Sequence, residues 1–306
     1  MIVITGGLGF IGNELARQLI RQNKPLAIVD NRNRVAPAID DILVSAACYE
    51  IDIVDFPALD ALFQVLKPEI VVHLAAIHFI PECNENPERT LRINVEGTSS
   101  IVRAAKHAGT KRIIFASSGA VYDDLSGMLT EESSILPVDI YGYSKLFGEG
   151  ICRLNARADF EIVACRLFNN YGPRETNAHI IPEIMKQLRN GNDLLHLGNI
   201  KPIRDYIHTW DTAQAIMRIM TAELPNAFTP VNICTGTGYA VENLIGIISQ
   251  LLNRDIRIEI DSNRLRKVDK MVQLGSFERL QKITGWEPKW EIAPGLRDLL
   301  VYEGIA

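Results

Sequence analysis

A glycine-rich turn near the N-terminus constrains the possible fold of this chain more than any other sequence feature. The segment 5-TGGLGFIG-12 follows an apolar run at 2–4 and opens a helical pattern at 10–22. Gly6 permits a tight turn, Gly9 lets backbone N–H groups approach a pyrophosphate, and Gly12 lets the helix pack closely against the strand. The N-terminus of that helix presents its positive end to the phosphates. The pattern predicts a dinucleotide site on a parallel α/β sheet, with a ligand-free glycine turn as the alternative.

Short apolar runs alternate with helical patterns through the first half of the chain. The runs are apolar almost throughout, as is typical of parallel strands that are covered on both faces. We therefore predict an α/β fold with a doubly wound parallel sheet, the Rossmann arrangement. The expected strands are 2–5, 26–30, 70–75, 112–117 and 161–167, and the expected helices include 10–22, 56–66, 88–108 and 140–156.

The regular alternation of strand and helix patterns ends near residue 169. Asn, Pro and Gly become frequent in 169-NNYGPRETN-177, and shorter elements follow, including a strand at 230–235 and a helix at 241–252. We predict that residues 1–168 form the dinucleotide-binding domain and that 169–306 form a smaller α/β substrate-binding lobe. Segments of the second part are expected to return to the first sheet.

Composition excludes several classes of function. The chain of 306 residues has a net charge of −5 and no basic run, which argues against a nucleic-acid partner. No apolar stretch reaches the ~18 residues of a membrane span, and the N-terminus enters a strand directly, so we expect neither a membrane span nor a signal peptide. The five cysteines are scattered without a C-x-x-C pair, which is typical of reduced thiols. We predict a cytoplasmic protein without a metal site.

The end of the second expected strand indicates which dinucleotide is bound. Asp30 lies 18 residues beyond the last glycine of the turn, where a carboxylate accepts both ribose hydroxyls of NAD and repels the 2′-phosphate of NADP. Arg32 and Arg34 follow and could soften this preference, but NAD is favoured. Asp52 and Ile53 are placed to flank the adenine, and a plain surface aspartate is the alternative for Asp52.

The stretch 141-YGYSK-145 contains a candidate base. A free tyrosine loses its proton only near pH ~10, so it is a poor base at neutral pH. Tyr141 and Lys145 are spaced by one helical turn and share a face, whereas Tyr143 points elsewhere. An ammonium beside the phenol favours the phenolate, as does the positive charge of oxidised nicotinamide, so we expect Lys145 and the bound dinucleotide together to lower the pKa of Tyr141. The same spacing also recurs in ordinary amphipathic helices, so by itself it does not show that Tyr141 is catalytic.

Further motifs follow in a fixed order along the chain. They are 73-HLAAI-77, 94-NVEGT-98, 115-FASSGAVY-122, 141-YGYSK-145, 166-RLFNNYGPR-174, 204-RDYIH-208 and 285-GWEPKW-290. With the glycine turn, they make the chain resemble the extended short-chain dehydrogenases/reductases of the NAD-dependent sugar epimerase/dehydratase family over nearly its whole length. The resemblance implies NAD as cofactor, a nucleotide-diphosphate sugar as substrate, and a homodimer formed through the helices at 88–108 and 140–156.

The resemblance also assigns roles to individual residues. Tyr141 and Lys145 match the catalytic pair, and Ser118 matches the catalytic Ser/Thr. Arg266 matches a phosphate-binding arginine, but the family usually has Arg-Pro-Gly-Asp where this chain has Arg-Lys-Val-Asp. The residues expected to line the cofactor are Gly6, Gly9, Phe10, Ile11, Gly12, Asp30, Asn31, Asp52, Ile53, Leu74, Ala75, Ala76, Asn94, Tyr141 and Lys145. Those expected to contact the substrate are Ser118, Asn169, His179, Leu195, Arg204, Arg266 and His78.

The two residues after Ser118 separate the branches of the family. Family 4,6-dehydratases carry an Asp-Glu pair there, and UDP-glucuronate decarboxylases usually carry a Glu at the second position. This chain has Gly119 and Ala120, which supply neither acid nor base. The resemblance therefore implies epimerisation at C4 through a transient 4-keto sugar, on a UDP-hexose or UDP-hexuronate. The alternatives are a 4-keto-sugar reductase, a dehydratase or decarboxylase of the same family, and a non-catalytic NAD-binding regulator.

Several other residues have two interpretations each. His78 could reach the substrate or simply cap a loop. Arg174 could clamp a sugar carboxylate, serve the diphosphate or join the two lobes. Cys83 and Cys165 are expected to pack in the core rather than to exchange protons. Gln273 aligns with a position that shapes the sugar pocket, through a segment that departs from the family pattern.

Overall fold

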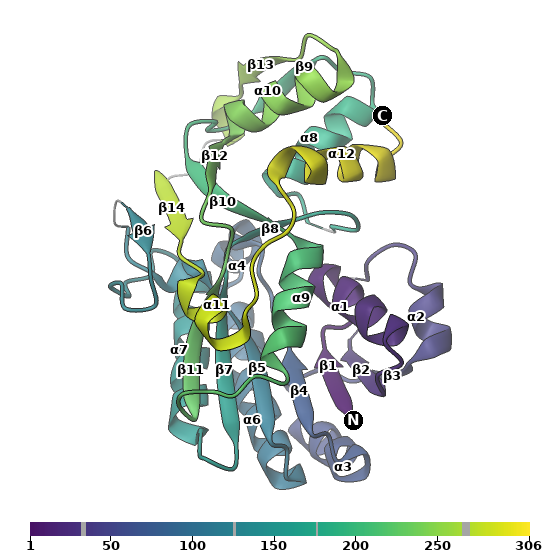
Figure 1. Cartoon of the computed structure of the whole chain (residues 1–306), viewed down its shortest axis with the longest axis vertical. Coiled ribbons are helices and arrows are strands. Elements are labelled where there is room, and N and C mark those ends of the chain that lie inside the picture. Colours follow the sequence, from purple (N-terminus) through teal and green to yellow (C-terminus); the bar gives the residue numbers. More distant parts are fainter. Residues whose placement is uncertain (32–34, 125–126, 176, 265–269) are drawn as a thin grey trace.

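The computed structural model describes residues 1–31, 35–124, 127–175, 177–264 and 270–306. Arg32, Arg34 and Arg266, for which the sequence suggested roles, lie outside the described residues. Figure 1 shows two lobes, with a large sheet and its helices below and a smaller group of strands and helices above. The N-terminus lies at the foot of β1, so the parallel strands run upward toward the second lobe.

The first lobe is built on a seven-stranded parallel sheet, which confirms the predicted fold class. The strand order reverses beside β1, because β2 and β3 extend the sheet to one side and β4, β5, β7 and β11 extend it to the other. Ligands of open α/β sheets bind in the crevice that such a reversal leaves at the carboxyl ends of the strands. Across the sheet, the strands are β11 (Phe228–Ile233), β7 (Glu161–Leu167), β5 (Arg112–Ser118), β4 (Ile70–His73), β1 (Ile2–Thr5), β2 (Leu26–Asp30) and β3 (Ala47–Glu50).

Helices cover both faces of this sheet, and the strand residues alternate between two cores. Ile2 and Ile4 pack with α1 (Phe10–Arg21) and α9 (Thr209–Ile219), whereas Val3 packs with α3 (Phe56–Leu66) and α6 (Gly97–Ala108). Because both faces are dry, the inner strands are apolar at most positions, which is why they were recognisable. The edge strand β3 is partly exposed and mixed in sequence, and it was not among the expected strands.

One expected helix is interrupted. The segment 88–108 folds as α5 (Pro87–Leu91), a π-helical turn (Arg92–Glu96) and then α6. A π-turn inserts an extra residue into the helical ladder and often occurs at functional sites. Here it carries the buried side chain of Asn94 toward the loop that follows β4. Periodicity alone does not reveal this, since the flanking helices continue on either side.

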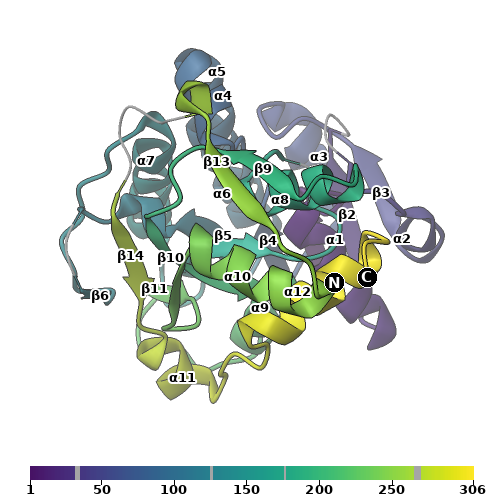
Figure 2. The ribbon, with the colours of Figure 1, turned by 90° about the horizontal axis from the view of Figure 1, so that it is seen from above.

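The second lobe contains a mixed sheet and its own apolar core. Its helices are α8 (Ile180–Arg189), α10 (Val241–Leu252) and α12 (Ile292–Tyr302), of which α10 and α12 lie side by side in Figure 2. The mixed sheet contains β12 (Gly238–Ala240), β10 (Ile203–His208), β14 (Val272–Gly275) and β6 (Met128–Leu129), with β8 (Asn169–Tyr171) paired to β10. A separate pair joins β9 (Leu194–Leu197) and β13 (Arg257–Ile260).

The chain crosses between the lobes more than once. The early strand β6 belongs to the second lobe's sheet, whereas α9 and β11 return to the first lobe. The division at 168/169 stays a prediction. In the described part of the chain, no helix has the length and apolar character needed to span a membrane. The remaining elements are α2 (Asp40–Ser45), α4 (Ile80–Glu85), α7 (Ile140–Asn155), α11 (Glu278–Thr284) and the 3-10 turns Gly119–Val121 and Ser262–Arg264.

Candidate active site

A cavity of about 670 Å³ lies at the carboxyl ends of β1, β4 and β5, which is a size typical of ligand sites. Residues of both lobes line it. The predicted site residues among them are Gly6, Gly9, Phe10, Ile11, Gly12, Asp30, Asn31, Ile53, Leu74, Ala75, Ala76, His78, Ser118, Tyr141, Lys145, Asn169, His179 and Arg204. The structure therefore brings together most of the residues that the sequence assigned to cofactor and substrate.

The glycine turn forms a cradle that side chains would fill. Gly6 has φ +69°, and a Cβ added to it would lie 2.8 Å from the Ala75 backbone. A Cβ on Gly12 would lie 2.2 Å from the carbonyl oxygen of Gly6. Within the described residues, no side chain caps the start of α1 at Gly9. The first N–H groups of α1 therefore face the cavity ready for an anion, as a pyrophosphate requires.

Helix α7 positions the candidate base. Asp139 caps its N-terminus by accepting a hydrogen bond from the Gly142 N–H at 2.7 Å. Gly142 packs tightly, because a Cβ there would lie 2.7 Å from the carbonyl oxygen of Ala120. This close approach brings Tyr141 near Ser118, and both side chains line the cavity. The glycine inside YGYSK thus sets the distance between the two candidate catalytic groups.

Lys145 lies one turn further along α7 and is 4% exposed. Its ammonium donates to the Ala116 carbonyl at 2.7 Å and lies 5.8 Å from the centre of the Tyr141 ring. Burial lowers the pKa of Lys145 to about 8. The Ser118 hydroxyl is held in place because it accepts a hydrogen bond from the Ala120 N–H at 3.1 Å.

The electrostatics of Tyr141 differ from the expectation drawn from the sequence. Burial raises the pKa of Tyr141, and the nearby Ser118 hydroxyl only partly opposes that rise. Asp139 raises this pKa further, because a nearby negative charge disfavours the phenolate. In the chain alone the pKa of Tyr141 is therefore raised, whereas the expected lowering also rests on the positive charge of oxidised nicotinamide. The phenolate requires an additional positive charge in the cavity.

The family of this chain follows from comparison with known proteins. The sequence profile of the NAD dependent epimerase/dehydratase family matches residues 2–234. The chain belongs to that family. Its cofactor is NAD, and the cradle around the glycine turn fits the pyrophosphate of that dinucleotide.

Similar proteins within the family have different activities. The GDP-6-deoxy-D-mannose reductase of Pseudomonas aeruginosa is 27% identical, and the match covers 98% of this chain and 95% of the reductase. The UDP-glucose 4-epimerase of Halalkalibacterium halodurans is 28% identical, with 94% and 91% covered. The crystal structure of UDP-glucose 4-epimerase from Thermotoga maritima with UDP-glucose is 26% identical, with a TM-score of 0.90 and 98% and 97% covered.

Asp30, the carboxylate predicted to bind the NAD ribose, lies in the cavity lining. It is buried at the end of β2, lines the cavity and accepts a hydrogen bond from the Leu8 N–H at 3.0 Å. Ile53 lines the same end of the cavity and packs against Gly97. Its neighbour Asp52 lies outside the lining and accepts from the Val54 N–H at 3.2 Å, so it stabilises a turn.

Two other predicted residues lie outside the cavity lining. Asn94 accepts from the Ile77 N–H at 2.8 Å and donates to the Ile77 carbonyl at 2.8 Å and to Ser144 Oγ at 2.9 Å. Asn94 therefore connects the loop after β4 to α7, and it holds these two parts of the cavity wall in place without lining the cavity itself. Leu195 is fully buried in the second lobe, where β9 pairs with β13.

Some residues that line the cavity had no role in the sequence-based site. Asp139 could have been recognised as an N-cap directly before a helical pattern. Glu175 lies in the irregular segment after β8, where no periodic signal exists. Lys270 is buried, donates to the Tyr122 carbonyl and follows the stretch that departs from the family pattern. Burial lowers its pKa.

Arg174 does not line this cavity. Its guanidinium lies 3.8 Å from the Glu14 carboxylate and 5.3 Å from the centre of the Tyr302 ring. These partners belong to α1 and α12, one from each lobe. Of the three roles considered for Arg174, the contacts favour the one that joins the lobes.

Proposed function

We propose that this enzyme inverts C4 of a nucleotide-diphosphate sugar through a transient 4-keto sugar. The observation that carries the proposal is that Ser118, Tyr141 and Lys145 share one cavity with the glycine cradle. The turn Gly119–Val121, which follows Ser118 directly, carries no carboxylate. Ser118, Tyr141 and Lys145 therefore support oxidation and reduction at one sugar carbon. Dehydration or decarboxylation would need a further acid or base at the turn after Ser118.

In the proposed mechanism, the side chains handle one proton and one oxygen. Tyr141 takes the proton of the C4 hydroxyl, and Ser118 donates a hydrogen bond to the same oxygen. Lys145 holds positive charge beside the phenol below about pH 8. NAD, when bound, supplies the acceptor and donor of the C4 hydride and a positive charge near the phenol. After the keto sugar turns, Tyr141 returns its proton, so no net oxidation occurs.

The proposed substrate is a UDP-hexose or UDP-hexuronate. Similarity to UDP-glucose 4-epimerases over at least 94% of the chain supports the nucleotide. Arg204, on β10, lines the cavity and is proposed to bind the diphosphate, with Asn169 contacting the same ligand. Residues 1–168 are proposed to bind NAD and 169–306 mainly the sugar nucleotide.

A second candidate function is reduction of a nucleotide 4-keto sugar. The similarity to a GDP-6-deoxy-D-mannose reductase over 98% of the chain favours it. A reductase uses the same Ser-Tyr-Lys set but consumes one reduced cofactor in each turnover. Asp30 weighs against this candidate where the reductant is NADPH, because a carboxylate repels the 2′-phosphate.

The test is a panel of UDP-, dTDP-, GDP- and CDP-sugars, incubated with purified protein without added cofactor and followed by NMR. We expect inversion at C4 of a UDP-sugar without loss of water or CO₂. Entry of solvent deuterium at C5 would contradict simple epimerisation, which breaks only the C4–H bond. Consumption of NADPH with a keto sugar, and no epimer in the panel, would establish the reductase instead.

We also propose a cytoplasmic homodimer. Tyr143, Phe147 and Leu154 are exposed large apolar side chains on α7, one of the two helices expected at the interface. The five cysteines, all within the described residues, are free thiols, which suits a reducing compartment. Light scattering after gel filtration should give twice the chain mass, and Phe147→Glu should shift the protein toward monomer.

A further inference from the structure

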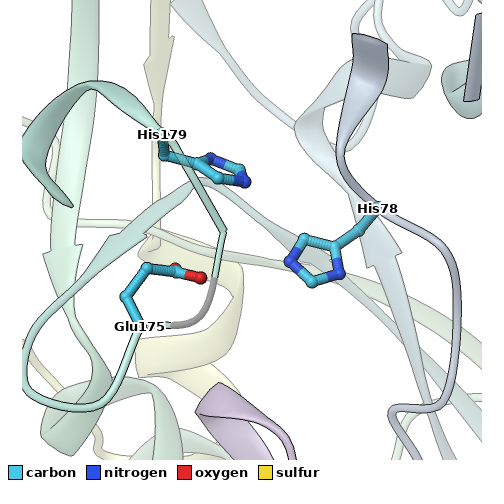
Figure 3. Close-up of side chains that lie close together, drawn as sticks. All are labelled: His78, Glu175 and His179. Atoms are coloured by element: carbon cyan, nitrogen blue, oxygen red, sulfur yellow. The ribbon is translucent and has the colours of Figure 1, made fainter. Parts of the chain in front are cut away.

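Three side chains that suit a transition metal meet inside the cavity. His78, Glu175 and His179 each place one ligand atom within 4.8 Å of the others. In Figure 3, both imidazoles and the carboxylate point into the same small space between two loops. The three residues are partly buried, and all of them line the cavity. The sequence predicted no metal site, because residues 78 and 175 are nearly 100 positions apart.

Neighbouring groups hold this cluster in place. The Asn177 N–H donates to Oε1 of Glu175 at 3.0 Å, and its side-chain amide nitrogen lies 3.0 Å from Nε2 of His78. The rings of His78 and His179 have centroids 5.7 Å apart, and Phe79 packs on His179 with centroids 5.4 Å apart. The Asn177 backbone N–H orients the Glu175 carboxylate as an outer partner of a metal ligand does, whereas an ion bound at Nε2 of His78 would displace the Asn177 side-chain amide.

The size and chemistry of the cluster suit zinc. Zinc binds nitrogen and oxygen at about 2.0–2.2 Å in a tetrahedron, so its ligand atoms lie roughly 3.3 Å apart. The cluster reaches that spacing if its atoms close by about 1.5 Å or less. Two imidazoles and one carboxylate, with one open position, form a known zinc donor set. Magnesium and calcium prefer oxygen ligands throughout, and they fit this set poorly.

The cluster also connects the two lobes. His78 lies in the loop after β4, whereas Glu175 and His179 lie between β8 and α8. His179 is the N-cap of α8, whose positive end opposes a cation, and the Glu175 carboxylate supplies the compensating negative charge. An ion held by all three residues would link the loops across the cavity.

We propose that His78, Glu175 and His179 form a binding site for one Zn²⁺ ion that clamps the lobes together over the cavity. The proposal does not depend on C4 epimerisation, because binding is measured without any sugar nucleotide. A bound ion stabilises only the folded protein, so the melting temperature should rise with zinc concentration.

The test uses tag-free, full-length protein freed of metal by chelation. Equilibrium dialysis should show one Zn²⁺ per chain, and the melting temperature should rise by several degrees. His78→Gln, Glu175→Gln and His179→Gln should each weaken binding about 100-fold or more. The metal-free variants should melt near the wild-type temperature, which shows that they fold. Co²⁺ should give visible bands without a thiolate charge-transfer band.

The matched control is His196→Gln. His196 is half-exposed on β9, where its Nδ1 lies 3.6 Å from the Glu259 carboxylate, and it does not line the cavity. This variant should bind Zn²⁺ as the wild type does. Absence of binding, equal binding by the three cluster variants, or a thiolate band with Co²⁺ would each overturn the proposal.

Discussion

Tyr141→Phe removes one oxygen and leaves the ring in place, so it separates chemistry from packing. A positioned general base contributes roughly 10²–10⁴-fold to rate, or about 3–5 kcal/mol at 1.36 kcal/mol per tenfold. The substitution keeps the packing of the ring and removes one hydroxyl, a change that costs about 1 kcal/mol of stability. We therefore expect kcat to fall at least ~100-fold, while the free energy of unfolding changes by about 1 kcal/mol.

Tyr143→Phe is the matched control, because it makes the same chemical change two residues away. Tyr143 is 38% exposed, and its ring centroid lies 6.2 Å from that of Phe147. The substitution keeps that ring contact, and surface changes of this kind usually alter stability by about 0.5 kcal/mol or less. We expect kcat within about twofold of wild type, since this tyrosine does not line the cavity.

The assay measures kcat by NMR on the substrate found in the sugar panel, with bound NAD and urea unfolding measured in parallel. Both variants should retain NAD, because the cradle around the glycine turn is intact. In wild type, kcat should rise on the acid side as the phenol ionises, and Tyr141→Phe should lose that rise. The reasoning is refuted if Tyr141→Phe keeps more than about a tenth of the rate, or if Tyr143→Phe causes the larger loss.

Three further predictions concern the scaffold around the site. Gly12→Ala places a Cβ 2.2 Å from the Gly6 carbonyl oxygen, so the purified variant should contain no bound NAD when its absorbance is measured. Retention of NAD at the wild-type level would contradict the role of the glycine turn in binding NAD. Arg166→Met leaves the Glu149 carboxylate buried without its bonds of 2.8 and 2.9 Å, and urea unfolding should show a loss of about 3–5 kcal/mol; a loss below 1 kcal/mol would argue against an uncompensated charge. Burial lowers the pKa of His73 from 6.5 to about 3, so the unfolded state binds the extra proton, and stability should fall as pH drops from 6.5 toward 3 by up to roughly 5 kcal/mol. His73→Gln should flatten that dependence, and an unchanged slope would assign it to other groups.

Local sequence patterns were sufficient to predict the fold class and most strands of the large sheet. Apolar strands reveal themselves when both faces are dry, and glycines reveal a turn that no side chain fits, as Gly6 and Gly12 show. Hydrophobic patterns did not predict elements that are partly exposed or that depart from regular helical geometry. The edge strand β3 is partly exposed, and the helix at 88–108 contains a π-turn.

The sequence by itself determined the parallel α/β fold and the glycine cradle, and it predicted Tyr141 rather than Tyr143 as the base, because each depends on residue type and short spacing. Only the tertiary structure decided how acidic Tyr141 is, since its pKa depends on burial that Lys145 does not offset. It also decided that His78 meets Glu175, because contact between distant segments depends on how the lobes pack.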